Sequence, residues 1–200
     1  QTMNQPIKLS KGEATRQRIL TAARALIDES GIALLSQEAA ARRAGISQST
    51  LRHHFVTKDA LIDAIFDANF TSYFDYGNAI LLDPALGVRE RLLRLLTTHI
   101  DYALQRSDRF ALESFIFATR NPALQARRDH WYQWRSAQMA ALLQQLRPEL
   151  TADQCAERAT ALLTLSLGTW IRFGRSMVTP AEAASGRTAL VSAATLIIDA

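Results

Sequence analysis

A segment near the start of the sequence carries small and apolar residues at the spacing of a helix-turn-helix. In a frame that begins at Gln37, the fifth, ninth and fifteenth positions are filled by Ala41, Gly45 and Leu51. The fifth position has to be small because two helices cross there, the ninth is glycine because the turn is tight, and the fifteenth is apolar because it docks the second helix on the first. A helix docked in this way can lie in the major groove of DNA. The chemistry that this spacing predicts is therefore hydrogen bonding to base edges and phosphates.

Capping signals predict the helices that would hold this segment. Ser10 and Glu13 stand three residues apart, so each side chain can satisfy a free backbone N–H at the start of a helix. Apolar residues then recur at helical spacing as far as Gly31, a residue type that commonly ends helices. A serine or threonine stands ahead of each following helical stretch and can cap it. The helices predicted here span residues 11–30, 36–44 and 47–55, with a fourth that begins at 58.

The rest of the chain also follows a helical period, and no strand alternation is evident. Thr151 and Gln154 repeat the capping-box pattern ahead of a strongly apolar stretch. Residues 174–186 combine two glycines, a proline and several small residues, which is typical of a connection. We therefore expect an all-α protein whose last two helices span about 152–173 and 188–198.

Positive charge is concentrated at the start of the chain. The whole sequence has a formal net charge of +4. Residues 1–58 hold nine lysines and arginines against four acidic residues, so this segment carries +5 and the remainder carries −1. A basic segment attached to a nearly neutral body is typical of a polyanion-binding module joined to a second domain.

Several classes of function are disfavoured by the same sequence. Cys155 is the single cysteine, which leaves no intrachain disulfide, and the adjacent His53 and His54 lack the spacing of metal ligands. No nucleophile motif, glycine-rich phosphate loop or paired-carboxylate motif stands out, so we expect neither catalysis nor a metal or cofactor. No apolar run approaches the roughly 18 residues of a membrane span, and no secretory signal is recognisable. We therefore expect a cytoplasmic protein that makes no membrane contact.

The residues around the helix-turn-helix frame resemble the DNA-binding signature of the TetR family. The resemblance covers about residues 13–65. It implies an all-α fold of about nine helices, with a helix-turn-helix DNA-binding domain over 8–57 and a ligand-sensing and dimerisation domain over 58–200. Beyond residue 65 the similarity is one of length and helical layout. The residues that carry the resemblance are Thr15-Arg16, Ile19, Ala22-Ala23, Leu26, Gly31, Ala41, Ala44-Gly45-Ile46-Ser47, Thr50-Leu51, His53-His54-Phe55, Lys58 and Leu61.

The resemblance also implies which side chains meet DNA. Gln48 can pair with adenine and Arg52 with guanine through two hydrogen bonds each, while hydroxyl and imidazole groups can contact phosphates. Thr57 and Lys58 open a helix, where free N–H groups and the helix dipole favour an anion. The sequence departs from the family at 52, where arginine replaces the usual tyrosine, and at Gln37, where an aliphatic residue is more common. The implied set is Thr15, Arg16, Ser36, Gln37, Ser47, Gln48, Ser49, Thr50, Arg52, His53, His54, Thr57 and Lys58.

Aromatic residues concentrate in the second part of the chain. At helical spacing they are interpreted first as core, but the interior of a helical bundle is also where ligand sites form. An apolar or aromatic effector is favoured for such a site, and a cation held over Trp131 and Trp134 is the alternative. The candidate lining residues are Phe66, His99, Tyr102, Phe117, Trp131, Trp134 and Trp170.

The last two predicted helices favour a partner because they are apolar on more than one face and include small residues. The TetR family forms its homodimer through this pair, which would set two recognition helices on successive turns of the major groove and predict an inverted-repeat operator. The function that the resemblance implies is that of a transcription repressor, released from double-stranded operator DNA by a small-molecule effector. The alternative is a helical adaptor or small-molecule-binding protein without specific DNA binding.

Overall fold

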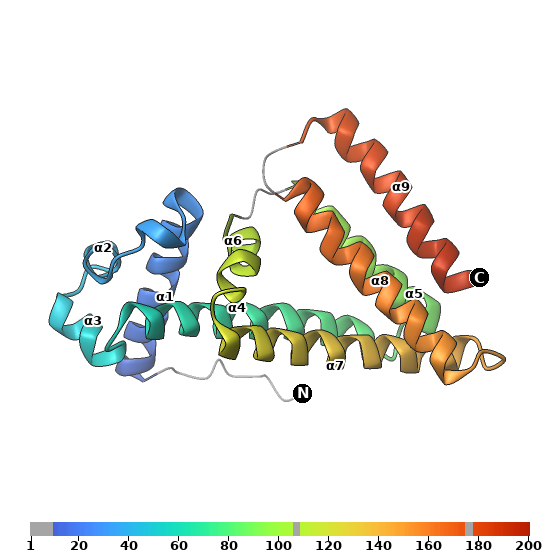
Figure 1. Cartoon of the computed structure of the whole chain (residues 1–200), viewed down its shortest axis with the longest axis horizontal. Coiled ribbons are helices and arrows are strands. Elements are labelled where there is room, and N and C mark those ends of the chain that lie inside the picture. The colour runs from blue at the N-terminus through green and yellow to red at the C-terminus, as the bar shows by residue number, and fades with distance from the viewer. Residues whose placement is uncertain (1–9, 106–108, 175–177) are drawn as a thin grey trace, which may run out of the picture. The chain divides into compact units, whose positions relative to one another are not determined.

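Helices make up the regular structure of the part of the chain that is described, which comprises residues 10–105, 109–174 and 178–200 of a computed structural model. No strand occurs within these ranges, so the all-α prediction is confirmed. Figure 1 labels the nine α-helices that these residues form. Their bounds are α1 (Lys11–Ser30), α2 (Gln37–Arg43), α3 (Gln48–His54), α4 (Lys58–Leu81), α5 (Val88–Gln105), α6 (Arg109–Ala118), α7 (Pro122–Leu146), α8 (Ala152–Phe173) and α9 (Pro180–Asp199), with a 3-10 turn η1 (Ile32–Leu34) after α1.

Two compact units divide the chain, Gln1–Asn69 and Phe70–Ala200, and α4 begins in the first and ends in the second. The first unit has a core made by one face of α1, which packs on α2, together with apolar residues of α3 and α4. Ile19, Ile27, Leu51 and Leu61 are fully buried there. Full burial of aliphatic side chains at a spacing of three and four residues explains why these short helices hold together.

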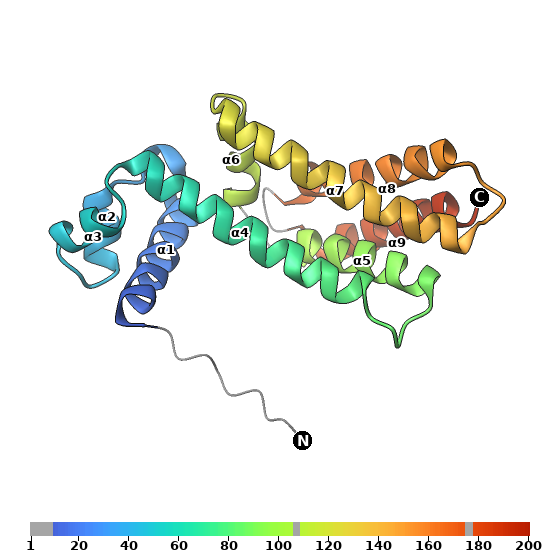
Figure 2. The ribbon, with the colours of Figure 1, turned by 90° about the horizontal axis from the view of Figure 1, so that it is seen from below.

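The second unit is built around α5, which contacts α7, α8 and α9. Helices α7 and α8 pack on each other next to the turn that joins them, as Figure 2 shows. Met139 and Leu143 of α7 are buried there against Cys155 and Leu162 of α8. Cys155 is thus a small apolar core residue.

The last helix begins earlier than the sequence analysis predicts. The expected connection over 174–186 is wrong from Pro180 onward, because α9 starts there; residues 175–177 lie outside the described residues. Thr179 and Glu182 form a capping box, and proline is favourable as the first helical residue because its missing N–H would have had no partner there. Gly186 lies inside α9, where a Cβ atom would come within 3.1 Å of the Phe173 ring. This glycine serves the close approach of α9 to α8, and not a loop.

Within the described ranges, none of the helices is both long enough and apolar enough to span a lipid bilayer.

Candidate functional site

The turn between α2 and α3 contains a glycine in the left-handed conformation. Gly45 has φ +66°, and its N–H donates to the carbonyl of Arg42 at 3.2 Å. Ile46 donates to the carbonyl of Ala41 at 3.1 Å, which completes the turn. No atom lies within 4 Å of the position of a Cβ on Gly45, so the requirement for glycine is conformational and not steric.

We predict that Gly45→Ala lowers the free energy of unfolding by about 1 kcal/mol, because L-residues with a Cβ pay that order of cost in the left-handed region. Gly45→Asn should lose less than half as much, since asparagine tolerates this conformation. Urea unfolding followed by circular dichroism measures both. The control is Gly87→Ala, at another glycine with open space around its Cβ position but no left-handed φ. Equal losses at positions 45 and 87 would contradict the assignment.

The second helix of the motif is docked by packing and by one side-chain hydrogen bond. Leu51 is fully buried, and Ala40 and Ala41 are buried on the facing helix. Gln37 donates from Nε2 to the carbonyl of Phe55 at 2.7 Å. This hydrogen bond connects the start of α2 to the C-terminal end of α3. This bond explains a glutamine where an aliphatic residue is usual, and it occupies the Gln37 amide within the protein.

One face of α3 is exposed and rich in hydrogen-bonding groups. Gln48, Ser49, Arg52 and His53 are exposed, while Thr50 and His54 are half-buried. Ser47 is the N-cap and accepts from the backbone N–H of Thr50 at 3.1 Å. Its Oγ also lies 2.8 Å from the hydroxyls of Ser49 and Thr50, so these three hydroxyls fix the first turn of the helix.

Arg52 differs from the arginines at the end of α2 in having no ion pair within the described residues. Arg43 makes two hydrogen bonds of 2.6 Å to the carboxylate of Glu29. These hydrogen bonds raise the pKa of Arg43 and lower the pKa of Glu29. Arg42 lies 3.9 Å from Glu38. Arg52 is therefore the arginine of this motif whose guanidinium remains available to an external acceptor.

The predicted phosphate contacts lie at helix ends or on the surface of the first unit. Ser36 caps α2 by accepting from Ala39 N at 3.1 Å, and Thr57 caps α4 by accepting from Ala60 N at 3.0 Å. A cap of this kind leaves the remaining N–H groups of the first turn free to face an anion.

The three remaining phosphate candidates have defined partners. Thr15 donates its hydroxyl to the carbonyl of Lys11 at 2.9 Å. Arg16 is exposed and places its guanidinium 5.2 Å from the centre of the Phe55 ring. Lys58 donates from Nζ to the carbonyl of Ala33 at 3.1 Å, which holds its ammonium beside the loop between α1 and α2.

The residues predicted to line an effector site do not form one group. Phe66 is buried in the first unit, and the other six belong to the second. Trp131 stacks on Phe74 with ring centres 4.4 Å apart, and Trp134 lies 5.8 Å from the same ring. Tyr102 and Trp170 form a separate pair at 5.3 Å, and Phe117 is half-buried on α6.

His99 lies in a buried polar group. Its Nδ1 is 3.1 Å from the hydroxyl of Tyr73 and 3.1 Å from the hydroxyl of Ser166, and its ring stacks on Tyr73 at 4.6 Å. Burial, with a contribution from the charge of Arg135, lowers the pKa of His99 to about 3. The imidazole is therefore neutral at neutral pH.

We predict that His99 makes the protein less stable as the pH falls from about 6.5. The unfolded chain binds a proton near the ordinary pKa of 6.5 and the folded chain only near 3, so between these values acid favours the unfolded state. The loss at pH 5 should be about 2 kcal/mol. Urea unfolding at pH 7 and pH 5 measures it.

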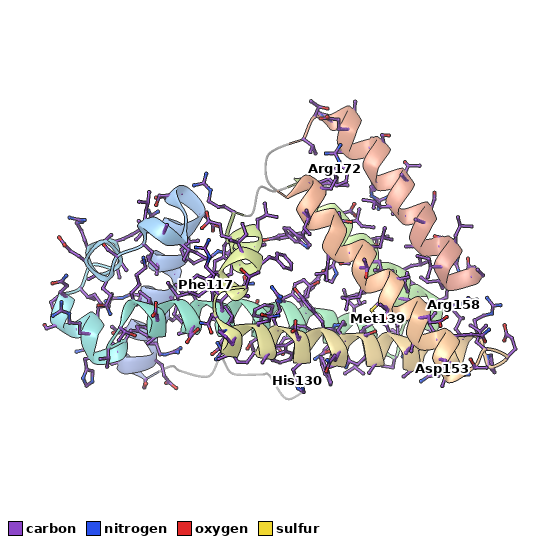
Figure 3. The ribbon with its side chains drawn as sticks, viewed as in Figure 1. Phe117, His130, Met139, Asp153, Arg158 and Arg172 are labelled. Atoms are coloured by element: carbon purple, nitrogen blue, oxygen red, sulfur yellow. The ribbon has the colours of Figure 1, made fainter. Side chains whose placement is uncertain are left out.

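The His99→Asn variant should lack this part of the pH dependence. His130 provides the control, since it is exposed and Figure 3 shows it on the side of α7 away from Met139. His130→Asn should leave the wild-type pH dependence intact. If His99→Asn and wild type lost the same free energy between pH 7 and pH 5, the burial of a neutral imidazole would be refuted.

The sequence analysis did not predict the residues that surround His99 and Arg135 in this polar group. Tyr73 and Ser166 lie within hydrogen-bonding distance of His99. Arg135 is 2% exposed and donates to the carbonyl of Phe74. One signal was available: Arg128 and Arg135 occupy positions in the apolar stripe of α7 that runs from Leu124 to Leu142. An arginine at a core position of a helical period has to be buried or has to break the pattern.

Helices α8 and α9 border an apolar groove with a volume of about 530 Å³. Ala161, Leu165 and Gly168 of α8 line it, with Leu190 and Ile197 of α9, and Arg172 stands at its end, as Figure 3 shows. Outward-facing apolar residues lie on the same two helices: Ile171 is 62% exposed and Leu196 is 70% exposed. Exposed aliphatic residues around a groove are typical of an interaction surface.

The chain combines an N-terminal helix-turn-helix with a second helical unit. Its structural class is therefore that of a two-unit helix-turn-helix protein. Residues 19–65 match the family model described as "Bacterial regulatory proteins, tetR family". The HTH-type transcriptional regulator UidR of Escherichia coli is 45% identical over 56 residues, which are 28% of this chain and 29% of UidR. Over residues 19–65 the chain is therefore similar to the DNA-binding region of the TetR family.

Solved structures show that the likeness of fold extends over the whole chain. Salmonella enterica GusR has a TM-score of 0.70 at 24% identity, over 97% of this chain and 100% of GusR. A transcriptional regulator from Rhodococcus sp. Rha1 has a TM-score of 0.73 at 20% identity, over 92% of this chain and 96% of its own. The sequence match to UidR spans less than a third of that relative's length, whereas the match of fold to these two solved structures covers more than nine tenths of the chain.

Proposed function

We propose that the chain is a dimeric, sequence-specific DNA-binding transcription regulator that leaves an inverted-repeat operator when a small molecule binds. The observation that carries the proposal is the exposed polar face of α3, whose Arg52 has no ion pair among the described residues, inside the segment that matches the TetR family. Gln48 and Arg52 are one helical turn apart, so both can reach base edges in one groove. The relative UidR is named as an HTH-type transcriptional regulator, which supports the proposal.

DNA binding is assigned to residues 8–57 and sensing and dimerisation to 58–200, a functional division in which residues 8 and 9 lie outside the described residues. The surface of α3 supplies base contacts, and Ser36, Thr57 and Lys58 supply phosphate contacts that set the position of α3. A chromosomal operator places the protein in the bacterial cytoplasm.

Dimerisation through α8 and α9 is supported by the apolar groove between them and by the exposed Ile171 and Leu196. A twofold axis through this surface makes the two copies of α3 equivalent, so their half-sites are inverted repeats. Repression relieved by a ligand requires only that the ligand binds more tightly to the form whose α3 helices do not fit successive major grooves.

The test is retention of genomic DNA fragments by the purified protein at moderate salt, followed by sequencing. Recovery of a few short inverted repeats is the expected result. Retention that is independent of sequence, or none, would overturn the proposal and favour a helical adaptor. The variant Arg52→Met is the matched control, because it should keep the fold and recover inverted repeats whose preference is relaxed at one base pair of each half-site.

A further inference from the structure

A buried arginine in the second unit carries a charge that no described residue neutralises. Arg135 lies in the middle of α7 and is 2% exposed. Its Nη2 donates to the carbonyl of Phe74 at 3.1 Å, and its Nη1 donates to the side-chain oxygens of Asn78 at 3.2 Å and Gln138 at 2.9 Å. All three acceptors are neutral, and Nε has no partner in the described structure. A buried cation is normally paired with an anion, so this guanidinium lacks its usual partner.

The surroundings of Arg135 are shaped to hold a guanidinium. Gly77 of α4 faces it so closely that a Cβ atom there would lie 2.6 Å from Nη2 and 3.0 Å from Cζ. The guanidinium lies 4.8 Å from the centre of the Phe74 ring and 5.3 Å from that of Trp134. Glycine on one side and aromatic faces on the other fix the plane of the fork, which is the arrangement that recognises a planar anion.

A second unsatisfied nitrogen belongs to the same neighbourhood. The Nε2 atom of His99 is buried without a hydrogen-bond partner within the described residues. The Tyr73 hydroxyl can donate to Nδ1, and in that tautomer the ring proton resides on Nε2, which makes that atom a donor. Tyr73 is next to Phe74, whose carbonyl holds Arg135, so α4 links the two groups.

The same face of α7 carries a second arginine, which is half-buried. Arg128 stands seven residues before Arg135, and its Nε and Nη1 atoms are buried without a hydrogen bond. The carboxylate of Asp129 lies 3.8 Å from Nε of Arg128. The Arg128 guanidinium lies over the rings of Phe115 and Tyr132. Two turns of α7 therefore present excess positive charge among aromatic rings.

We propose that the buried Arg135 guanidinium binds the carboxylate of the effector, with His99 Nε2 as a neighbouring donor and the rings of Phe74 and Trp131 against the apolar part of the molecule. The inference rests on the proposed sensing function, and it names an aromatic or otherwise apolar anion as the effector class. A cationic effector is disfavoured, because Arg135 already lies on the ring of Trp134 and would repel it. Phosphate shares the recognition chemistry of a carboxylate, so the test has to separate the two.

The test uses the full-length protein, with tryptophan fluorescence and thermal unfolding as readouts and benzoate, benzamide and inorganic phosphate as probes. Benzoate should change the fluorescence of wild type and raise its Tm, with an affinity at least tenfold higher than that of benzamide, which has the same ring and no charge. Arg135→Met should abolish this difference. Arg94→Met, at an exposed arginine paired with Glu90 on α5, is the control and should behave as wild type.

The stability of the variants separates recognition from a structural role. Because a buried unpaired cation opposes folding, Arg135→Met should unfold at a temperature no lower than wild type in the absence of probe. A structural arginine would instead give a variant with a markedly lower Tm, which would overturn the proposal. Arg135→Lys retains the charge but not the fork, and should restore only part of the benzoate response.

The remaining outcomes also decide the matter. Equal responses to benzoate and benzamide, or no response of wild type to benzoate and phosphate, would overturn the proposal. A response to phosphate alone would establish the anion site and replace the carboxylate by a phosphate group. Operator binding is measured separately on wild type and Arg135→Met without probe. Normal DNA affinity in both would show that any failure belongs to the effector site and not to the proposed function.

Discussion

Joint replacement of Arg52 and Lys58 by methionine should lower operator affinity by at least 100-fold. Arg52 is exposed and has no ion pair among the described residues, so its fork is free for a guanine, a contact whose discrimination is of the order of 1 to 3 kcal/mol. Lys58 stands at the first turn of α4, where a capped helix start also favours a phosphate. A dimer loses each contact twice, which brings the combined loss to a few kcal/mol.

The slope of affinity against salt concentration distinguishes these two contacts. Loss of a phosphate contact from each subunit should reduce the magnitude of the slope of log K against log salt by about 2. Fluorescence anisotropy with labelled operator at several salt concentrations measures both quantities. Lys58→Met alone should weaken binding to all sequences alike, whereas Arg52→Met alone should relax the preference at one base pair. The control is Arg94→Met, on a helix of the second unit. If the double variant kept the operator affinity and the salt slope of wild type, α3 would be excluded as the recognition helix.

Most of the first unit could be predicted from the sequence, because its structure depends on local signals. The caps at Ser10, Ser36 and Ser47 and the glycine at 45 act within three or four residues of their own positions. The bounds expected for the first helix are those of α1, and the two short helices end within a residue of their expected limits. Gln37 was not predictable in this way, since its partner is the carbonyl of Phe55, eighteen residues away.

The second unit was less predictable because its decisive contacts are distant in sequence. Gly186 reads as a loop residue by type, but it lies inside α9, where a Cβ atom would come within 3.1 Å of the distant Phe173 ring. Arg135 reads as a surface residue by type; its place in the apolar stripe of α7 indicates burial, but its partners Asn78 and Phe74 lie 57 and 61 residues away in the sequence. A helical period detects a buried face, but it does not say which polar residue within that face will find partners.

The two units lead to one mechanical requirement for regulation. The two half-sites of an operator fit only one distance between the α3 helices of the proposed dimer. An effector acts only if its affinity differs between the α3–α3 distances that this dimer can adopt. In the proposed dimer, the subunit interface therefore has to be rigid enough to transmit this preference, and its loss should weaken DNA binding as strongly as loss of a base contact.

Gly168→Glu should convert the proposed dimer into a folded monomer. Gly168 is exposed on α8 and lines the apolar groove, and no atom lies within 4 Å of the position of a Cβ there. A side chain at this position therefore has room in the isolated subunit, and the helix gains from the loss of a glycine. In a twofold interface packed on the groove, the same carboxylate would be buried without a partner, which is strongly unfavourable. Analytical ultracentrifugation at micromolar concentration should show half the wild-type mass, with unchanged circular dichroism.

Operator affinity of the Gly168→Glu monomer should fall by at least 100-fold, because the second half-site no longer binds at the high effective concentration that the dimer provides. Gly87→Glu supplies the matched control, with the same change in size and charge at a glycine that also has open space around it and lies outside the groove. That variant should remain dimeric and bind operator as wild type does. A dimeric Gly168→Glu protein would place the subunit interface elsewhere, because a buried carboxylate on this groove and an intact interface through it are incompatible.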